Sequence, residues 1–206
     1  MSEEREWWRR VLVVPVRPRV AFAGLRDDRP EAVEARQEPI LALILLAGVA
    51  GILATPAWQT LMDDASRDPL VVAVLTFIGG SLYGAAGYWI VGGALYLALR
   101  GLGSPAPYRR ARHLVALSVV PLVLSLVVLP IEIAAYGGDV FRSGGDDEGA
   151  PETIFLLLRL GFVGWTVGLL AVGIQELEAW TWEKVAGAVA LSALVLAAAL
   201  AIPSVL

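Results

Sequence analysis

Long uncharged stretches dominate the chain, and charged or polar residues separate them. A helix crosses the hydrocarbon core of a bilayer with about 20 consecutive apolar residues. Five segments satisfy this requirement, and we expect each to be a transmembrane helix: 39–58, 69–99, 113–136, 153–175 and 184–205. The second is longer than a bilayer requires, so it should tilt, kink or project at one end. We expect kinks at Pro121 and Pro130 in the third. The pattern predicts an all-α membrane protein whose five-helix bundle covers residues 39–206.

Residues 1–38 precede the first span and form a charged segment of their own. The stretch EREWWRRVLVV places Trp7 and Trp8 on the same helical side as the apolar residues that follow. Pro18 suits the first position of a second short helix, because its fixed φ matches the helical value. We expect a short amphipathic segment that Trp7, Trp8 and Phe22 anchor in the membrane interface. A solvated basic leader is the alternative.

Lys and Arg are distributed unevenly between the two sides of the predicted bundle. Thirteen lie in the N-terminal segment and in the loops after the second and fourth spans, whereas only Arg67 and Arg142 lie in the other loops. Cytoplasmic loops carry the excess of positive charge in membrane proteins. We therefore expect a cytoplasmic N-terminus and an extracytoplasmic C-terminus.

Composition argues against several classes of function. The chain is 57% hydrophobic and 17% charged, whereas soluble domains are about 45–50% apolar and about 25% charged. The absence of Cys excludes disulfides and thiolate zinc sites, and a single His excludes a multi-His metal site. A net charge of −4 argues against nucleic-acid binding. Neither GxSxG nor HExxH occurs, so we expect no enzymatic activity, no metal and no cofactor.

Two opposite charges interrupt the apolar spans. Glu132 lies near the end of the third span, within LSLVVLPIEIAAYGG, and Arg159 lies near the start of the fourth. At ~1.5 Å per residue, both lie roughly 7–9 Å below the outer ends of their helices. Consecutive antiparallel helices are expected to be neighbours, so we predict a structural ion pair. Two alternatives stay open: the side chains snorkel separately to the interface, or they form a cation- or proton-handling site.

Glycines recur at intervals of three or four residues in the second and fourth spans. Stripes of small residues let helices approach closely, and packing holds helices together where lipid provides no hydrophobic drive. We expect both stripes to pack within the chain, with self-association of two copies as the alternative. The stripes consist of Gly80, Gly84 and Gly87, and of Gly161, Gly164 and Gly168.

Polar residues gather where the third span begins and the fourth ends. Antiparallel packing brings these helix ends to one level, so we expect a cytoplasmic belt of salt bridges. A surface for a partner or a lipid headgroup is the alternative. We expect His113, the lone histidine, to be a polar cap rather than a catalyst. The belt consists of Arg109, Arg110, Arg112, His113, Gln175, Glu176 and Glu178.

Three stretches resemble the Yip1 domain family of polytopic membrane proteins: PRVAFAGL at 18–25, YRRARHLVALSVVP at 108–121 and GIQELEAWTWEKVAGAVAL at 173–191. The resemblance covers about residues 11–206. It implies five spans, which agrees with the count made independently. Eukaryotic relatives engage Rab-type GTPases through their N-terminal region. The corresponding region here is short and differs in character, so the resemblance does not support a GTPase partner.

Two functions are compatible with these features. The first is a non-enzymatic scaffold or adaptor that binds the lipid bilayer and either a second copy of the chain or another membrane protein. The second is a small ion, proton or lipid transporter or channel that uses Glu132 and Arg159. The Arg-, Ala- and Val-rich composition suggests a GC-rich prokaryote, in which the protein would lie in the plasma membrane.

Overall fold

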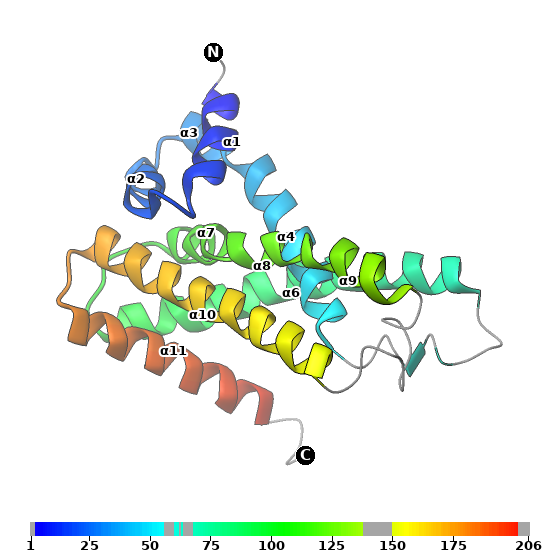
Figure 1. Cartoon of the computed structure of the whole chain (residues 1–206). Helices are drawn as coiled ribbons and strands as arrows, with labels where there is room; N and C mark the ends of the chain where they lie inside the picture. Colours follow the sequence, from blue (N-terminus) through cyan, green and yellow to red (C-terminus); the bar gives the residue numbers. More distant parts are fainter. Residues whose placement is uncertain (1–2, 56–59, 62, 64–67, 138–149, 202–206) are drawn as a thin grey trace.

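The computed structural model describes residues 3–55, 60–61, 63, 68–137 and 150–201 of the chain. Every regular element in these ranges is a helix (Figure 1). Five helical stretches are long and apolar enough to cross a membrane, which confirms the predicted fold class. They comprise α4 (Gln37–Leu53), α6 (Pro69–Gly101), the consecutive α7 (Tyr108–Ser118), α8 (Val120–Ser125) and α9 (Val128–Tyr136), then α10 (Ala150–Glu178) and α11 (Trp182–Ala201). The ends of two predicted spans, 56–58 and 202–205, lie outside the described residues.

Proline explains why the third span consists of three pieces. A proline has no amide hydrogen, so it cannot donate to the carbonyl four residues earlier. Pro121 leaves the carbonyl of Leu117 without its helical partner, and the helix breaks at Val119. Pro130 does the same to Leu126, next to the second break. The breaks lie where the sequence predicted kinks.

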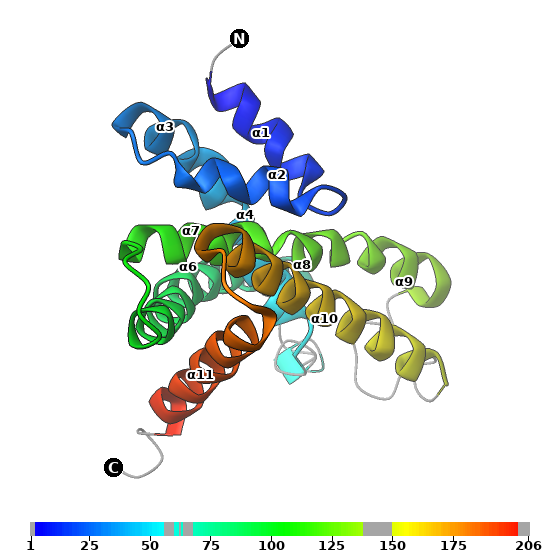
Figure 2. The same ribbon diagram turned by 90° about the vertical axis from the view of Figure 1, so that its left-hand side faces the viewer.

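The N-terminal segment folds into a cap of four short helices. These are α1 (Glu3–Val13), α2 (Pro18–Ala23), the 3₁₀ helix η1 (Gly24–Arg26) and α3 (Pro30–Ala35). Figures 1 and 2 show the cap beside α7 and the start of α4. Within it, α2 packs against α10 and η1 packs against α7. The cap is therefore joined to the bundle by contacts that are distant in the sequence.

The main buried cluster lies beneath the cap. Phe22 and Leu25 of the cap are buried together with Leu95, Leu114 and Ile174 of three spans. Away from this region the helices separate, and Figure 2 shows α10 and α11 diverging from the turn that joins them. Only 6% of the apolar part of α10 is buried inside the chain. The core thus holds one end of the bundle, and much apolar surface faces outward.

Glycines allow α4 and α6 to cross at close range. A Cβ atom on Gly84 would overlap the carbonyl oxygen of Ile44, and one on Gly80 would lie 2.7 Å from the Cα of Val49. A Cβ on Gly48 would overlap backbone atoms of both Gly80 and Gly84. The contacts are thus backbone against backbone, as expected for small residues at membrane helix crossings.

We predict that Gly84→Ala destabilises the protein and that Gly87→Ala does not. The added methyl at Gly84 must separate α4 from α6, and overpacking of this kind costs about 1–3 kcal/mol. A Cβ at Gly87 meets nothing within 4 Å, and alanine is the better helix former. Thermal unfolding of both variants in the same detergent tests this. Equal melting temperatures for the two would contradict the close crossing.

Candidate functional site

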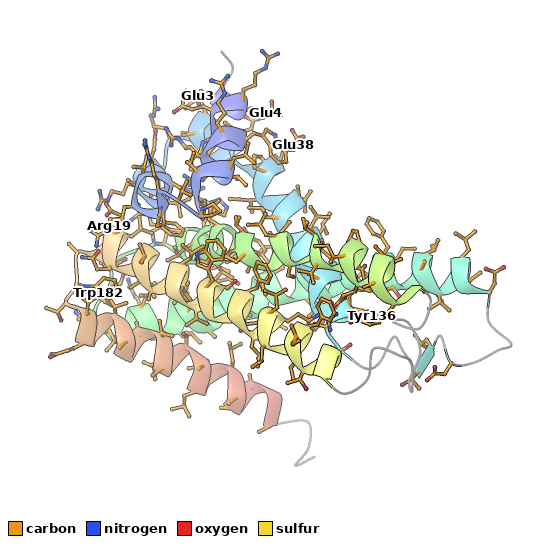
Figure 3. All side chains as sticks on the ribbon, viewed as in Figure 1. Glu3, Glu4, Arg19, Glu38, Tyr136 and Trp182 are labelled. Carbon is orange, nitrogen blue, oxygen red and sulfur yellow. The ribbon has the colours of Figure 1, made fainter. Side chains whose placement is uncertain are left out.

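The two charges inside the spans meet in the structure. Nη2 of Arg159 on α10 donates to both carboxylate oxygens of Glu132 on α9, at 2.7 Å each. Glu132 is only 3% exposed, whereas the Arg159 side chain is 36% exposed. Beside the pair, the rings of Tyr136 and Phe155 meet edge to face at 6.2 Å; Figure 3 labels Tyr136 near the end of α9. Two contacts thus tie α9 to α10 at this end.

A second group of charges joins the cap to the bundle. Asp28, between η1 and α3, accepts a hydrogen bond from Arg110 of α7, and Nη2 of Arg109 lies 3.5 Å from one of its oxygens. The fully buried Arg36 approaches Asp28 at 3.5 Å and donates to the carbonyl of Asp27 at 2.8 Å. Asp28, Arg36, Arg109 and Arg110 will be called the Asp28 cluster. One carboxylate thereby binds three cations from two parts of the chain.

Asp27, next to this cluster, is held by a different arginine. Arg29 Nε and Nη2 donate to its carboxylate at 3.0 and 2.7 Å. These hydrogen bonds lower the pKa of Asp27 to about 2. Asp27 is therefore ionised at neutral pH, and Arg29 balances its charge without drawing on the arginines that bind Asp28.

Arg112 occupies a cage of aromatic rings instead of a salt bridge. Its guanidinium carbon lies 3.8 Å from the ring centre of Trp89, 4.6 Å from that of Tyr108 and 5.1 Å from that of Tyr88. Its Nε is buried without a hydrogen-bond partner, and within the described residues it forms no salt bridge. A Cβ on Gly92 would overlap the Arg112 side chain, so this glycine makes room for the cage.

His113 lies next to the cage and is almost completely enclosed. It is 4% exposed, and its Nδ1 is buried without a hydrogen-bond partner in the described part of the chain. Buried polar atoms normally find a partner, so an unpaired one requires an explanation such as a missing ligand or water. The histidine lines the space between the cap and the bundle.

A protein-family model describes the sequence as a Yip1 domain and matches residues 12–203. The chain belongs to the Yip1 domain family. The match covers all five spans and most of the cap, and it confirms the resemblance seen in the sequence. No curated protein and no solved structure matches the chain significantly. Membership of the family, together with the five apolar helices, makes this a multi-pass membrane protein.

The predicted belt of this Yip1 domain forms with different partners. Glu176 and Gln175 were expected to face the arginines of α7. Instead, Nη2 of Arg26 in the cap donates to the backbone carbonyl of Glu176 and lies 3.2 Å from its carboxylate Oε1. Gln175 Oε1 is buried without a partner in the described residues. Glu178 shares a narrow crevice with Arg110 but forms no salt bridge in the described part of the chain. Salt bridges thus occur at these helix ends, but they run through the cap: Arg26 pairs with Glu176, and Asp28 pairs with Arg109 and Arg110.

The predicted interfacial anchors divide into two kinds. Trp8 is 37% exposed and is free to meet lipid. Trp7 and Phe22 are buried in the core and do not reach the interface. The guanidinium of Arg10 lies 4.9 Å from the Trp7 ring centre, and Phe22 packs against Gly173 of α10. The prediction for these two was wrong because the cap turns its apolar side toward the bundle.

Only some glycines of the two predicted stripes pack against another helix. Gly80 and Gly84 pack against α4, as the fold shows. Around Gly87, and around all three glycines of α10, a Cβ would meet nothing within 4 Å. These four glycines therefore do not pack closely against the described residues: the α10 stripe is turned outward, and Gly87 of α6 lines an apolar cavity. They are Gly87, Gly161, Gly164 and Gly168.

Sequence reasoning missed several residues of these sites. Gly48 precedes Gly51 by three residues in α4, so the spacing that identified the other stripes was the available signal here too. Asp28 and Arg36 lie in a segment that the sequence assigned to the membrane interface. Trp89 lies within an apolar stretch and gives no local sign that Arg112, 23 residues later, covers its ring. An excess of arginine over acidic residues in YRRARH was the signal available, because unpaired cations need partners from elsewhere.

We predict that Glu132→Gln destabilises the protein more than Glu132→Gln combined with Arg159→Gln. Removing one member of a buried pair leaves an uncompensated charge and costs about 3–5 kcal/mol when both groups are buried. Partial exposure of Arg159 should bring the cost to the lower end of this range or below. Thermal unfolding of both variants provides the measurement. A single variant as stable as the double would show that the pair does not clasp α9 to α10.

Proposed function

We propose that this Yip1 domain protein is a non-enzymatic membrane scaffold that binds another membrane protein along α10. The low burial of α10 carries the proposal, since only 6% of its apolar part is covered by the rest of the chain. Within the described part of the chain, a Cβ added at Gly161, Gly164 or Gly168 of its glycine stripe would meet nothing within 4 Å. An open stripe of this kind lets a second helix approach closely and gain van der Waals contact that lipid tails provide less well.

The partner under this proposal is a transmembrane helix, either of a second copy or of another protein. The Arg26–Glu176 ion pair and the Glu132–Arg159 pair support it by fixing α10 from both ends. Arg26 of the cap holds Glu176 at one end of α10, and Glu132 holds Arg159 near the other. A helix fixed in this way presents its outer face without further ordering, which lowers the cost of binding. The excess of Lys and Arg in the cap and adjoining loops places this end in the cytoplasm in our proposal.

Site-specific cross-linking tests the scaffold. The natural chain has no cysteine, so an introduced one is the only thiol available. Leu157 precedes Gly161 by one turn and is 62% exposed. We expect Leu157→Cys, labelled with a benzophenone in native membranes, to give one discrete adduct. Adding Gly164→Leu should abolish that adduct, because the leucine blocks close approach along the stripe.

A matched control is available on α11. Leu194 is 65% exposed and lies on a helix without an open glycine stripe of this spacing, so Leu194→Cys should yield no discrete adduct. A diffuse background from both positions, or an adduct that persists in the Gly164→Leu variant, would rule out binding along the stripe. The mass of the adduct distinguishes a second copy from another protein.

Transport is the second candidate function, and the buried carboxylate favours it. Ionisable groups inside spans commonly mark ion or proton pathways, and Glu132 lies in one at 3% exposure. Under this proposal, vesicles containing the purified protein show a proton or cation flux that Glu132→Gln reduces at least tenfold. A flux unchanged by that substitution, or no flux above that of empty vesicles, would reject it.

A further inference from the structure

A cavity of about 970 Å³ lies between the cap and the bundle. On one side it is lined by carboxylates from three helices: Glu3 and Glu4 of α1, Glu31 and Glu34 of α3, and Glu38 of α4. Figure 3 shows Glu3, Glu4 and Glu38 close together where α1 meets the start of α4. Within the described residues, none of the five forms a salt bridge. This acidic wall therefore has room for a cation from outside the chain.

Basic residues also line the cavity. They are Arg109 and Arg112, together with His113. Within the described residues Arg112 is held in the aromatic cage without a carboxylate partner, and Arg109 reaches Asp28 only at 3.5 Å. The Nδ1 of His113 is buried and unpaired in the described structure although the residue lines an open space. These groups are suited to an anion, since arginine offers several N–H donors in a fixed planar arrangement.

An apolar cavity of about 380 Å³ adjoins the charged one. Ile44 and Tyr88 line both cavities, so the two are neighbours with only these side chains in common. The second cavity runs between the spans and is lined mainly by apolar residues such as Val91, Leu122 and Leu170. Such a space matches a hydrocarbon chain, which gains nothing from polar neighbours.

We propose that the two cavities together bind one phospholipid whose headgroup carries both a phosphate and a primary ammonium, as in phosphatidylethanolamine. The ammonium lies against the acidic wall, the phosphate lies between Arg109 and Arg112 beside His113, and an acyl chain enters the apolar cavity. Both signs of charge line one space, which matches a zwitterion better than an ion of either sign alone. This site is separate from the α10 stripe, and the cross-linking result does not depend on it.

The chemistry of the acidic wall selects among lipids. A primary ammonium donates three hydrogen bonds to carboxylates, whereas a choline headgroup has no N–H to donate. A glycerol headgroup carries no cation and leaves the glutamates unpaired. The described residues hold no group of three or more His, Asp or Glu placed to bind a metal ion, so these glutamates are not arranged as a metal site.

Native mass spectrometry of the delipidated full-length protein in detergent tests the proposal. The probes are phosphatidylethanolamine, phosphatidylcholine and phosphatidylglycerol with identical acyl chains. We expect the ethanolamine lipid to bind about tenfold more tightly than the other two. Its ammonium makes one additional charge-assisted hydrogen bond, to the glutamates. The double variant Glu34→Gln, Glu38→Gln should remove that preference, because it removes two carboxylates of the acidic wall. Both side chains are exposed, so their loss leaves the fold intact.

Two matched controls accompany these variants. Glu6 lies on α1 outside the cavity, paired with Arg10 at 2.5 Å, so Glu6→Gln should leave the lipid preference unchanged. Arg112→Gln should weaken both the ethanolamine and the glycerol lipid, whereas Arg19→Gln, on the exposed side of the cap (Figure 3), should weaken neither. The melting temperature of each variant shows whether it is folded.

Three results would overturn the proposal. The first is equal binding of the three lipids by the natural protein. The second is an unchanged preference in the folded Glu34→Gln and Glu38→Gln variant. The third is displacement of the bound lipid by an equal concentration of glycerophosphoethanolamine, which has the headgroup but no acyl chain. That result would identify a soluble phosphate ester as the ligand and leave the apolar cavity without a role.

Discussion

The binding of three arginines by the single carboxylate of Asp28 organises the structure. Arg36 has no exposed surface, and a buried cation is tolerated only with acceptors close by. Asp28 and the carbonyl of Asp27 provide them. Because Arg109 and Arg110 belong to α7, the same carboxylate also fixes the cap on the bundle. The core beneath the cap and the cavity beside it both depend on this attachment.

The bundle shows how a membrane protein distributes its packing. Apolar side chains gain little by leaving lipid, so the helices meet closely where small residues or charges bring them together. Helices α4 and α6 are brought together by Gly48, Gly80 and Gly84. Helices α9 and α10 are brought together by the Glu132–Arg159 pair. The rest of α10 remains open. In water such a face would be a liability, whereas in lipid it is a stable surface on which a partner helix can compete with lipid.

Much of the fold was predictable because hydropathy and helix length are local properties. The five spans follow from them, and the breaks near Pro121 and Pro130 follow from the missing amide hydrogens. Counting residues from the helix ends was enough to predict that Glu132 and Arg159 lie at the same depth. The partners of the belt arginines were not predictable in this way, because Asp28 lies about 80 residues earlier in a segment that hydropathy alone assigns to the interface. The burial of Trp7 and Phe22 was not predictable either, because an amphipathic segment has the same pattern whether its apolar side meets lipid or protein.

The two charged sites differ in whether their polar groups have hydrogen-bond partners within the chain. Both oxygens of Glu132 accept from Arg159, so this site is complete within the chain, and a complete buried pair is what a structural clasp requires. The cavity beside the cap is incomplete within the described residues: Arg112 has rings but no carboxylate, His113 has an unpaired nitrogen, and five glutamates line the same cavity without a salt bridge. Arg112 Nε and His113 Nδ1 are buried, and leaving buried polar atoms unpaired costs free energy that folded proteins seldom leave uncompensated. A zwitterionic lipid supplies partners of both signs at once, and its acyl chain gives a role to the apolar cavity that adjoins the charged one.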